Sequence, residues 1–236
     1  MIILAMDTSG PVAGVAVMKD GTLVYEGAAV NKMTHSVNMM PMVEEALTRS
    51  GLTPDQIDLY AAVTGPGSFT GVRIGVSAIK GMAHGAGKSC IGVDALEALA
   101  AGLCCTQGVI CPIQDARAGQ VYGAAFRCGM PPVRLLADMA EKLTDYLDKV
   151  LAAALPDEKF YFLGDGVATY RQAILERLGD RAVFAPAHCS YLRPASVAML
   201  AHLHSGEAVN YLSLAPVYLR APQAERARAA KEAQKG

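Results

Sequence analysis

Tryptophan is absent from this sequence of 236 residues, and aromatic residues make up only 6% of it. The chain also has no stretch of about 18 uninterrupted apolar residues, the length that a membrane-spanning helix needs. No basic segment followed by an apolar run and a cleavage site stands at the N-terminus, so no secretory signal peptide is predicted. These absences predict a cytoplasmic protein with no membrane partner.

Charge of either sign is also sparse. Charged residues make up 18% of the chain and hydrophobic residues 52%, which is typical of a well-packed globular protein. The formal net charge is −1, and no long basic run precedes the last 15 or so residues. Proteins that bind nucleic acid by themselves usually carry a basic excess. We therefore expect any contact with RNA to be made mainly through a partner.

Metal-binding patterns are missing as well. None of the six cysteines forms a C-x-x-C pair. Without an export signal, they are expected to be free, buried thiols in a reducing cytosol. His202 and His204 are two residues apart on a predicted helix, so their side chains do not share a face. No metal site is predicted. The cysteines are Cys90, Cys104, Cys105, Cys111, Cys128 and Cys189.

The most informative stretch of the sequence runs from residue 58 to residue 81. Residues 59–63 predict a short strand and residues 64–68 a turn, and a helix is predicted from Phe69 or Thr70 onward. Gly71, Gly75 and Ala78 share one face of this helix. Each glycine costs roughly 1 kcal/mol relative to alanine in a helix interior. A close approach of another backbone is therefore expected, either within the chain's own sheet or across a contact with a partner subunit.

A second helix is predicted from about Thr34 or Ser36 to Arg49. Three methionines lie close together in it, at positions 39, 40 and 42. Methionine fills irregular cores and also suits adaptable binding surfaces. Core filling and an exposed partner-binding edge that includes His35 and Met39 both remain open.

The order of predicted elements indicates a duplication. Strands at 2–6, 12–18 and 22–29 are followed by a helix, the strand and helix of the 58–81 stretch, a strand at 90–93 and a helix at 95–103, which gives β-β-β-α-β-α-β-α. A second unit has predicted strands at 109–114, 120–127 and 159–163. Its predicted helices lie at about 135–155 and 169–178. A helix from Pro194 to about residue 206 and a strand at 217–220 follow.

This order predicts three parts of the chain. Residues 1–107 would form a first lobe, residues 108–193 a shortened second lobe, and residues 194–221 would pack back on the first lobe. Residues 222–236 are rich in Ala, Arg, Glu and Lys with no apolar face, which predicts a frayed tail.

The same order resembles the superfamily of actin, sugar kinases and heat-shock ATPases, and implies a duplicated α/β fold of that type with a shortened second lobe. In that superfamily the nucleotide lies between the lobes, held by turns rich in glycine. Side chains replace those glycines at positions 115–117 of this chain. The resemblance therefore implies a vestigial nucleotide cleft and no cofactor bound by this chain alone. Its expected residues are Asp7, Ser9, Asp115, Gly164 and Gly166.

A more specific resemblance is carried by residues 64–75, which read TGPGSFTGVRIG. This segment is similar to the signature of the TsaB (YeaZ) family, which is related to the TsaD/Kae family. The similarity extends to residues 3–9, 35–47, 92–100, 115–122 and 216–220. It implies a non-catalytic subunit that pairs with a TsaD-type transferase and a TsaE-type ATPase. Together they would transfer threonylcarbamoyl to the adenosine next to the anticodon of tRNA.

The resemblance also implies which chemistry this chain lacks. The TsaD-type subunit holds a metal on two histidines spaced four apart on a helix. In the matching stretch here, Ala95 and Leu99 stand at those positions and Glu97 remains. No catalytic residue is therefore assigned, and ATP and metal would be carried by the partners. Contact with tRNA would be made through the complex, and the isolated chain would form a homodimer.

Two predicted helices are expected to supply the dimer face: the methionine-containing helix that ends at Arg49 and the glycine-containing helix that begins at Phe69 or Thr70. Apolar helix faces, Met and Arg are enriched at such contacts. The expected partner-interface residues are His35, Met39, Met42, Gly71, Arg73, Gly75 and Ala78.

Two alternatives of other classes remain open. One is a stand-alone ATPase or small-molecule kinase that uses Asp7 and Asp115. The other is a direct tRNA-binding module with a basic patch built from Arg117, Arg127 and Arg134. The charge balance disfavours the second alternative.

Overall fold

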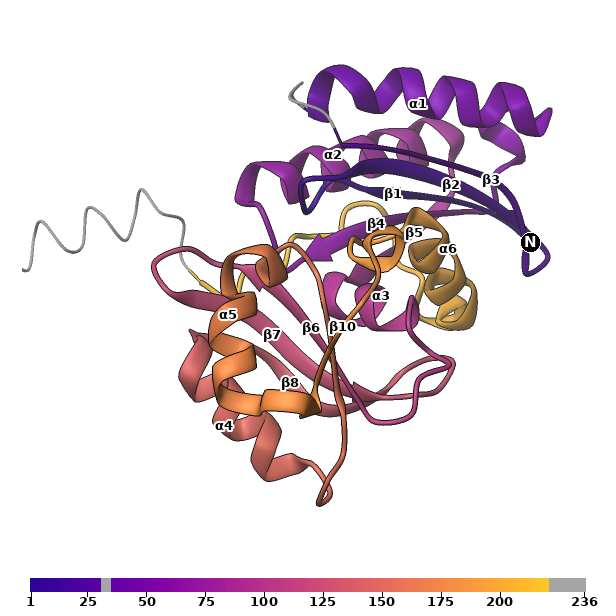
Figure 1. Cartoon of the computed structure of the whole chain (residues 1–236). Coiled ribbons are helices and arrows are strands. Elements are labelled where there is room, and N and C mark those ends of the chain that lie inside the picture. The colour runs from indigo at the N-terminus through magenta and orange to yellow at the C-terminus, as the bar shows by residue number, and fades with distance from the viewer. Residues whose placement is uncertain (31–34, 221–236) are drawn as a thin grey trace, which may run out of the picture.

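A computed structural model describes residues 1–30 and 35–220 (Figure 1). Two five-stranded sheets, with strand orders β3-β2-β1-β4-β5 and β10-β9-β6-β7-β8, form two lobes. Helices pack against both sheets, and α3 and α6 lie between the lobes. Two predictions fall outside the described residues: the helix start at Thr34 and the frayed tail at residues 222–236. No helix in the described part of the chain is long and apolar enough to cross a membrane.

The first lobe is built around β1, which pairs antiparallel with β2 and parallel with β4. Successive side chains of a strand point to opposite faces. Accordingly, Ile3 and Ala5 pack toward α3 and α6, whereas Leu4 and Met6 pack toward α1 and α2. The central strands are buried because helices cover both faces of the sheet. The elements are β1 (Ile2–Asp7), β2 (Ala13–Lys19), β3 (Thr22–Ala29), α1 (His35–Ser50), a 3-10 turn (Pro54–Gln56), β4 (Leu59–Gly65), α2 (Phe69–Ala86), β5 (Ser89–Asp94) and α3 (Ala95–Ala101).

The second lobe repeats the order β-β-β-α-β-α-β. Its elements are β6 (Val109–Asp115), β7 (Gln120–Arg127), β8 (Val133–Lys142), α4 (Leu143–Ala153), β9 (Phe160–Leu163), α5 (Gly166–Leu178) and β10 (Ala182–Phe184). Both sheets have five strands, so the expected shortening affects helices and not the sheet. The repeated order confirms the α/β fold of the actin, sugar-kinase and heat-shock ATPase type.

The helix predicted over residues 135–155 is wrong in its first half. Residues 133–142 form β8, which pairs antiparallel with β7, and only Leu143–Ala153 is helical. Leu, Ala, Met, Glu and Lys dominate this stretch and favour helix locally. Pairing with β7 overrides that preference, since strand formation depends on cross-strand neighbours. Strand β10 was also missed, and the strand predicted at 217–220 is absent from the described structure.

The C-terminal part of the chain returns to the first lobe. Helix α6 (Pro194–Leu203) packs between β1, β2 and the second lobe. At Gly14 of β2, a Cβ atom would lie 2.3 Å from Cγ of Pro194, so only glycine lets α6 approach this closely. Arg193 pairs with Glu26 of β3, and the backbone N–H of Ala195 donates to Glu26 Oε1 at 3.1 Å.

Candidate functional site: a helix-pair surface and an inter-lobe cleft

Helix α2 begins where its sequence predicts. Ser68 is the N-cap, and its hydroxyl oxygen accepts a hydrogen bond from the backbone N–H of Gly71 at 3.2 Å. The backbone N–H of Ser68 donates to the carbonyl oxygen of Ser9 at 2.7 Å. The start of α2 is thereby fixed to the turn that follows β1.

The glycines of α2 serve that same internal contact. A Cβ atom at Gly71 would lie 2.0 Å from the carbonyl oxygen of Thr8, and one at Gly75 would lie 2.6 Å from Thr8 Oγ1. Both glycines are buried. The close approach is therefore made within the chain, the first of the two possibilities above. Gly71 and Gly75 do not lie on a surface that a partner could reach, which corrects their assignment to the partner interface.

Met39 requires the same correction. Its side chain is 1% exposed and fills the core between α1 and the first sheet. The other expected interface residues reach the surface: Arg73 is exposed, and His35, Met42 and Ala78 are half-buried. The guanidinium of Arg73 lies 4.5 Å from the ring centroid of Phe69.

A groove of about 880 Å³ runs between α1 and α2. Met40, its most prominent apolar residue, is 50% exposed. The groove lies outside the predicted set of interface residues, although Met40, Val43 and Leu47 recur at helical spacing on α1. The lining residues are mostly apolar: Met40, Pro41, Val43, Glu44, Leu47, Thr48, Leu52, Thr53, Pro54, Asp55, Met82, Gly85 and Ala86.

A second hollow, of about 430 Å³, lies between the lobes. It is lined by residues 9–11, 66–69, 114–117 and 217–220, with Val72, Tyr122 and Asp165. Ser9 and Asp115 of the expected nucleotide cleft therefore face it. Asp7 and Gly164 line a separate cavity of only about 10 Å³. Gly164 and Gly166 pack against the backbone of Ile113. A Cβ atom added at Gly164 would lie 2.1 Å from the carbonyl oxygen of Ile113, and one added at Gly166 would lie 3.1 Å from it.

The C-terminal segment of residues 217–220 forms one wall of this inter-lobe cleft. The backbone N–H of Val217 donates to the carbonyl oxygen of Thr64 at 2.8 Å. Tyr218 stacks on Phe69 with ring centroids 4.9 Å apart, and Arg220 Nη1 donates to the carbonyl oxygen of Ala116 at 2.9 Å. The segment thus connects the first lobe to the turn after β6.

The two aspartates expected at the cleft are in different environments. Asp7 is buried, and desolvation raises its pKa from 3.8 to about 6, against the opposing effect of hydrogen bonds from Ser9. Asp115 accepts a hydrogen bond from the backbone N–H of Arg117 at 2.8 Å and one from the Tyr170 hydroxyl at 3.2 Å. Asp7 Oδ1 accepts a hydrogen bond from the backbone N–H of Ser9 at 2.7 Å, whereas Asp7 Oδ2 is buried without a hydrogen-bond partner among the described residues.

Metal-ligating groups do not converge in the described residues: no three His, Cys, Asp or Glu side chains are arranged to hold an ion. Ala95 and Leu99 of α3 are buried apolar residues. His204 lies 3.4 Å from Glu97 and also from Glu207. The side chains of Ala95 and Leu99 have no atom that could bind a metal, so α3 does not present two histidine ligands on one face.

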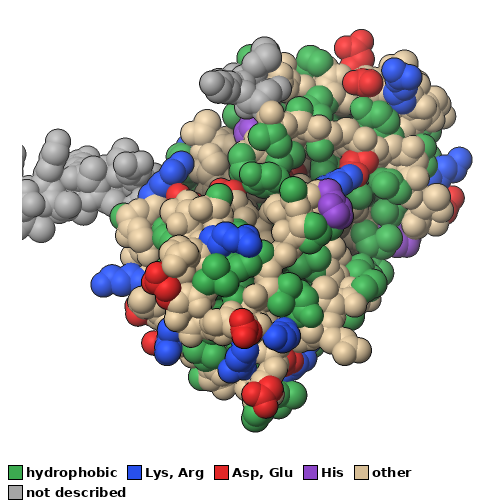
Figure 2. Space-filling model, in the orientation of Figure 1, with side chains coloured by type: hydrophobic (Ala, Val, Ile, Leu, Met, Phe, Trp, Pro, Cys, Tyr) green, Lys and Arg blue, Asp and Glu red, His purple; other side chains and the backbone are tan. Residues whose placement is uncertain are grey.

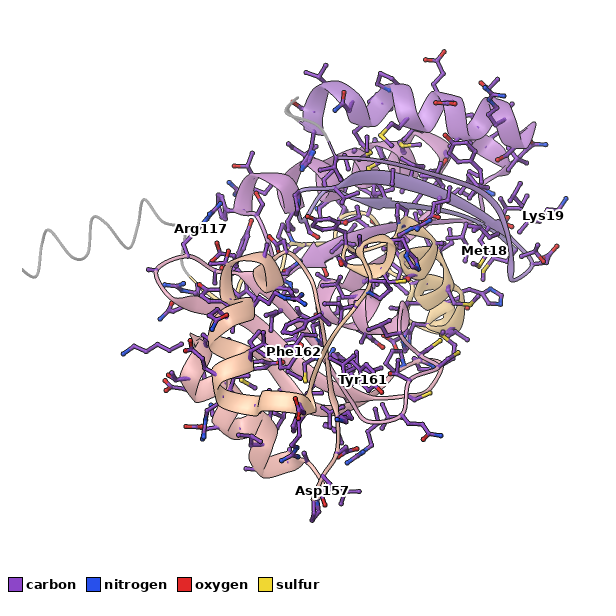
Figure 3. The ribbon with its side chains drawn as sticks, viewed as in Figure 1. Met18, Lys19, Arg117, Asp157, Tyr161 and Phe162 are labelled. Carbon is purple, nitrogen blue, oxygen red and sulfur yellow. The ribbon has the colours of Figure 1, made fainter. Side chains whose placement is uncertain are left out.

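The arginines considered for tRNA binding are each paired with an acidic residue. Arg117 pairs with Asp115, Arg127 with Glu158, and Arg134 with Asp138. In Figure 3, Arg117 projects at the boundary between the lobes. On the face shown in Figure 2, positive and negative side chains are interspersed over the second lobe. These pairings leave no uncompensated basic patch at the three arginines.

The cysteines are all free, but only Cys90 and Cys111 are buried. Cys104 and Cys189 are half-buried, and Cys105 and Cys128 are exposed. The expectation of six buried thiols is therefore wrong for four of them. The exposed pair lies in the connection between the lobes and at the end of β7, where backbone turns bring side chains to the surface.

Together these features define a two-lobed α/β protein with a duplicated, actin-like fold. The family described as "TsaD: tRNA N6-adenosine threonylcarbamoyltransferase" matches residues 29–228. The chain is 34% identical over 226 residues to the tRNA threonylcarbamoyladenosine biosynthesis protein TsaB of Bacillus subtilis (strain 168), which covers 95% of this chain and 96% of that protein. For the TsaB protein of Haemophilus influenzae, identity is 28%, with 93% and 94% covered.

The solved structure of YeaZ from Pseudomonas aeruginosa superposes with a TM-score of 0.73 at 26% identity, covering 92% of this chain and 99% of that one. The chain belongs to the TsaB family, within the wider family whose TsaD model it matches. The resemblance predicted from residues 64–75 is confirmed.

Proposed function

We propose that this protein is a non-catalytic subunit of the machinery that makes threonylcarbamoyladenosine on tRNA. It pairs with a TsaD-type transferase, and the pair works with a TsaE-type ATPase on the adenosine next to the anticodon. The observation that carries the proposal is the apolar groove between α1 and α2, which lies on the surface of the described part of a chain of this family.

The composition of this surface supports a protein partner. Met40 in the groove is 50% exposed, and outside the groove lining Val37 of α1 is 54% exposed and Arg73 of α2 is exposed on the same helix pair. Methionine and arginine are enriched at protein contacts, and apolar side chains gather at their centres. A self-complementary patch can also pair with a second copy around a two-fold axis. The same surface would therefore support a homodimer when the partner is absent.

The side chains at the expected metal and nucleotide positions support the absence of catalysis in this subunit. Ala95 and Leu99 replace the two metal-binding histidines that the TsaD-type subunit would carry, and neither has a lone pair to donate. The carboxylate of Asp115 is already occupied by Arg117 and Tyr170. Metal and ATP are therefore assigned to the partners. The net charge of −1 likewise assigns tRNA contact to the complex.

Reconstitution tests the proposal. The transferase subunit, the small ATPase, threonylcarbamoyl-adenylate and unmodified tRNA are combined with and without this chain, and the chain is assayed alone. We expect modified tRNA only when this chain is present with its partners, and no modification or ATP hydrolysis by the chain alone. Modification that is indifferent to this chain would contradict the proposal. Turnover of ATP by the isolated chain would favour the alternative of a stand-alone ATPase or kinase.

The groove itself is tested by Met40→Glu. Because the side chain is half exposed, the fold should tolerate the change, but a charge would then be desolvated in the contact. We expect binding to the TsaD-type subunit, measured by calorimetry, to weaken at least about tenfold, which corresponds to about 1.4 kcal/mol. The matched control is Val133→Glu on β8, where the native side chain is 56% exposed in the other lobe. Equal binding by the two variants would place the contact elsewhere.

A further inference from the structure

Three of the six cysteines gather at the junction between the lobes. Cys104 and Cys105 follow α3 in the connection that leads to β6, and their sulfur atoms are 3.9 Å apart. Cys128 follows the last residue of β7, and its thiol contacts the backbone carbonyl oxygen of Cys104. The fold thus brings the Cys128 thiol to the backbone of Cys104, a residue 24 positions earlier in the sequence.

Two of these three thiols are more exposed than every other cysteine of the chain. Cys105 and Cys128 are exposed and Cys104 is half-buried, whereas Cys90 and Cys111 are buried. Exposed thiols are the ones that oxidants reach. We infer that Cys104 and Cys128 form a reversible oxidation site, in which a hydroperoxide converts the two thiols into an intramolecular disulfide across the lobe junction.

The pairing with Cys128 follows from geometry. Consecutive Cα atoms are about 3.8 Å apart across a trans peptide bond, whereas disulfides usually join Cα atoms about 4.4–6.8 Å apart. A bridge between the adjacent Cys104 and Cys105 would therefore be strained. Cys128 comes from a different element and reaches the backbone of Cys104 already in the reduced state. Cys105 remains as a neighbouring thiol.

The order of reaction follows from exposure and ionisation. Burial, the Cys105 thiol and the nearby charge of Cys128 raise the pKa of Cys104, which disfavours its thiolate. Cys128 therefore reacts first. Its sulfur attacks the peroxide, the O–O bond breaks, and a sulfenic acid and an alcohol or water are produced. The sulfur of Cys104 then attacks the sulfenic sulfur, an S–S bond forms, the S–O bond breaks, and water leaves. Two thiols are oxidised by two electrons, and the peroxide is reduced.

The position gives the bond a structural consequence. Helix α3 packs between the lobes, where Leu96 and Leu99 share a cluster with Ile110 and Phe126 of the second sheet. A covalent link between the end of α3 and the end of β7 would hold the lobes in this arrangement. Since the link also closes a loop in the unfolded chain, we expect oxidation to raise the melting temperature, and a dithiol reductant to reverse the rise.

The test exposes the full chain to hydrogen peroxide, blocks the remaining thiols by alkylation and identifies cross-linked tryptic peptides by mass spectrometry. Trypsin leaves Cys90, Cys104, Cys105 and Cys111 in one peptide, because no Lys or Arg separates them, and Cys128 in another. We expect these two peptides to be joined, with the loss of two hydrogen atoms. Cys105→Ser should retain the link, and Cys104→Ser and Cys128→Ser should lose it.

Cys189→Ser is the matched control and should form the link as the wild type does, because it removes a half-buried thiol elsewhere. The inference would be overturned by a link that persists in Cys104→Ser, by covalent dimers on a non-reducing gel in place of the internal link, or by oxidation of Cys128 to sulfinic acid alone. Alkylation of Cys128 that is unchanged after peroxide would overturn it equally.

Discussion

Gly71→Ala is expected to lower the free energy of unfolding by about 3 kcal/mol, which is a large effect for the addition of one methyl group. The new Cβ atom would lie 2.0 Å from the carbonyl oxygen of Thr8, and a backbone atom cannot move aside as a flexible side chain can. Either α2 or the turn after β1 must shift. Equilibrium unfolding in urea, followed by circular dichroism, measures the change.

Gly81→Ala is the matched control on the same helix. Gly81 is exposed and no atom lies within 4 Å of its added Cβ. Alanine is favoured over glycine in a helix interior by up to about 1 kcal/mol, so this variant should be as stable as the wild type or more stable. Similar losses in both variants would mean that the contact between Gly71 and Thr8 does not limit the approach of α2.

The second large effect is expected at Asp7, where replacement by asparagine should stabilise the protein above neutral pH. Burial raises the pKa of Asp7 to about 6, so the native state binds this proton more tightly than the unfolded chain does. The resulting stabilisation is fully present below the unfolded pKa of 3.8 and is lost as the pH rises through about 6. A difference of about two pKa units corresponds to about 3 kcal/mol.

An asparagine side chain at this position has no charge to bury, and its amide oxygen can still accept the hydrogen bond that the Ser9 N–H donates to Asp7 Oδ1 at 2.7 Å. We therefore expect the free energy of unfolding of Asp7→Asn to fall less than that of the wild type between pH 4 and pH 8. Unfolding in urea across that range measures it. Asp157→Asn is the control, since Asp157 lies exposed at the tip of the second lobe (Figure 3). If the Asp7 variant follows the same pH profile as this control, Asp7 does not titrate as expected.

Burial also raises the pKa of Asp94, beside Asp138, and that of Asp165. These carboxyl groups contribute to the wild-type profile in the same direction. The difference between the wild type and Asp7→Asn therefore isolates Asp7, whereas the absolute profile does not.

Much of this protein could be predicted from local sequence signals. The turn at residues 64–68 and the helix after it follow from glycine, proline and the Ser68 cap, which act within a few residues. The hairpin of β2 and β3 follows from its Asp-Gly pair. Such features depend on residue type and spacing alone.

Other features depend on partners that lie far away in the chain. Residues 133–142 have helical propensity and become a strand because β7 offers an edge to pair with. Met39 is buried and Met40 exposed because α1 presents neighbouring positions to different surroundings, and the groove exists only because α2 lies beside it. Gly71 is required because Thr8 approaches it, and the Cys128 thiol reaches the backbone of Cys104 only because the fold brings these two segments together. Sequence alone determined the family and the duplicated fold, because these depend on residue identity and spacing. Tertiary structure decided which glycines, methionines and cysteines are available for contact, because availability depends on what packs against each side chain.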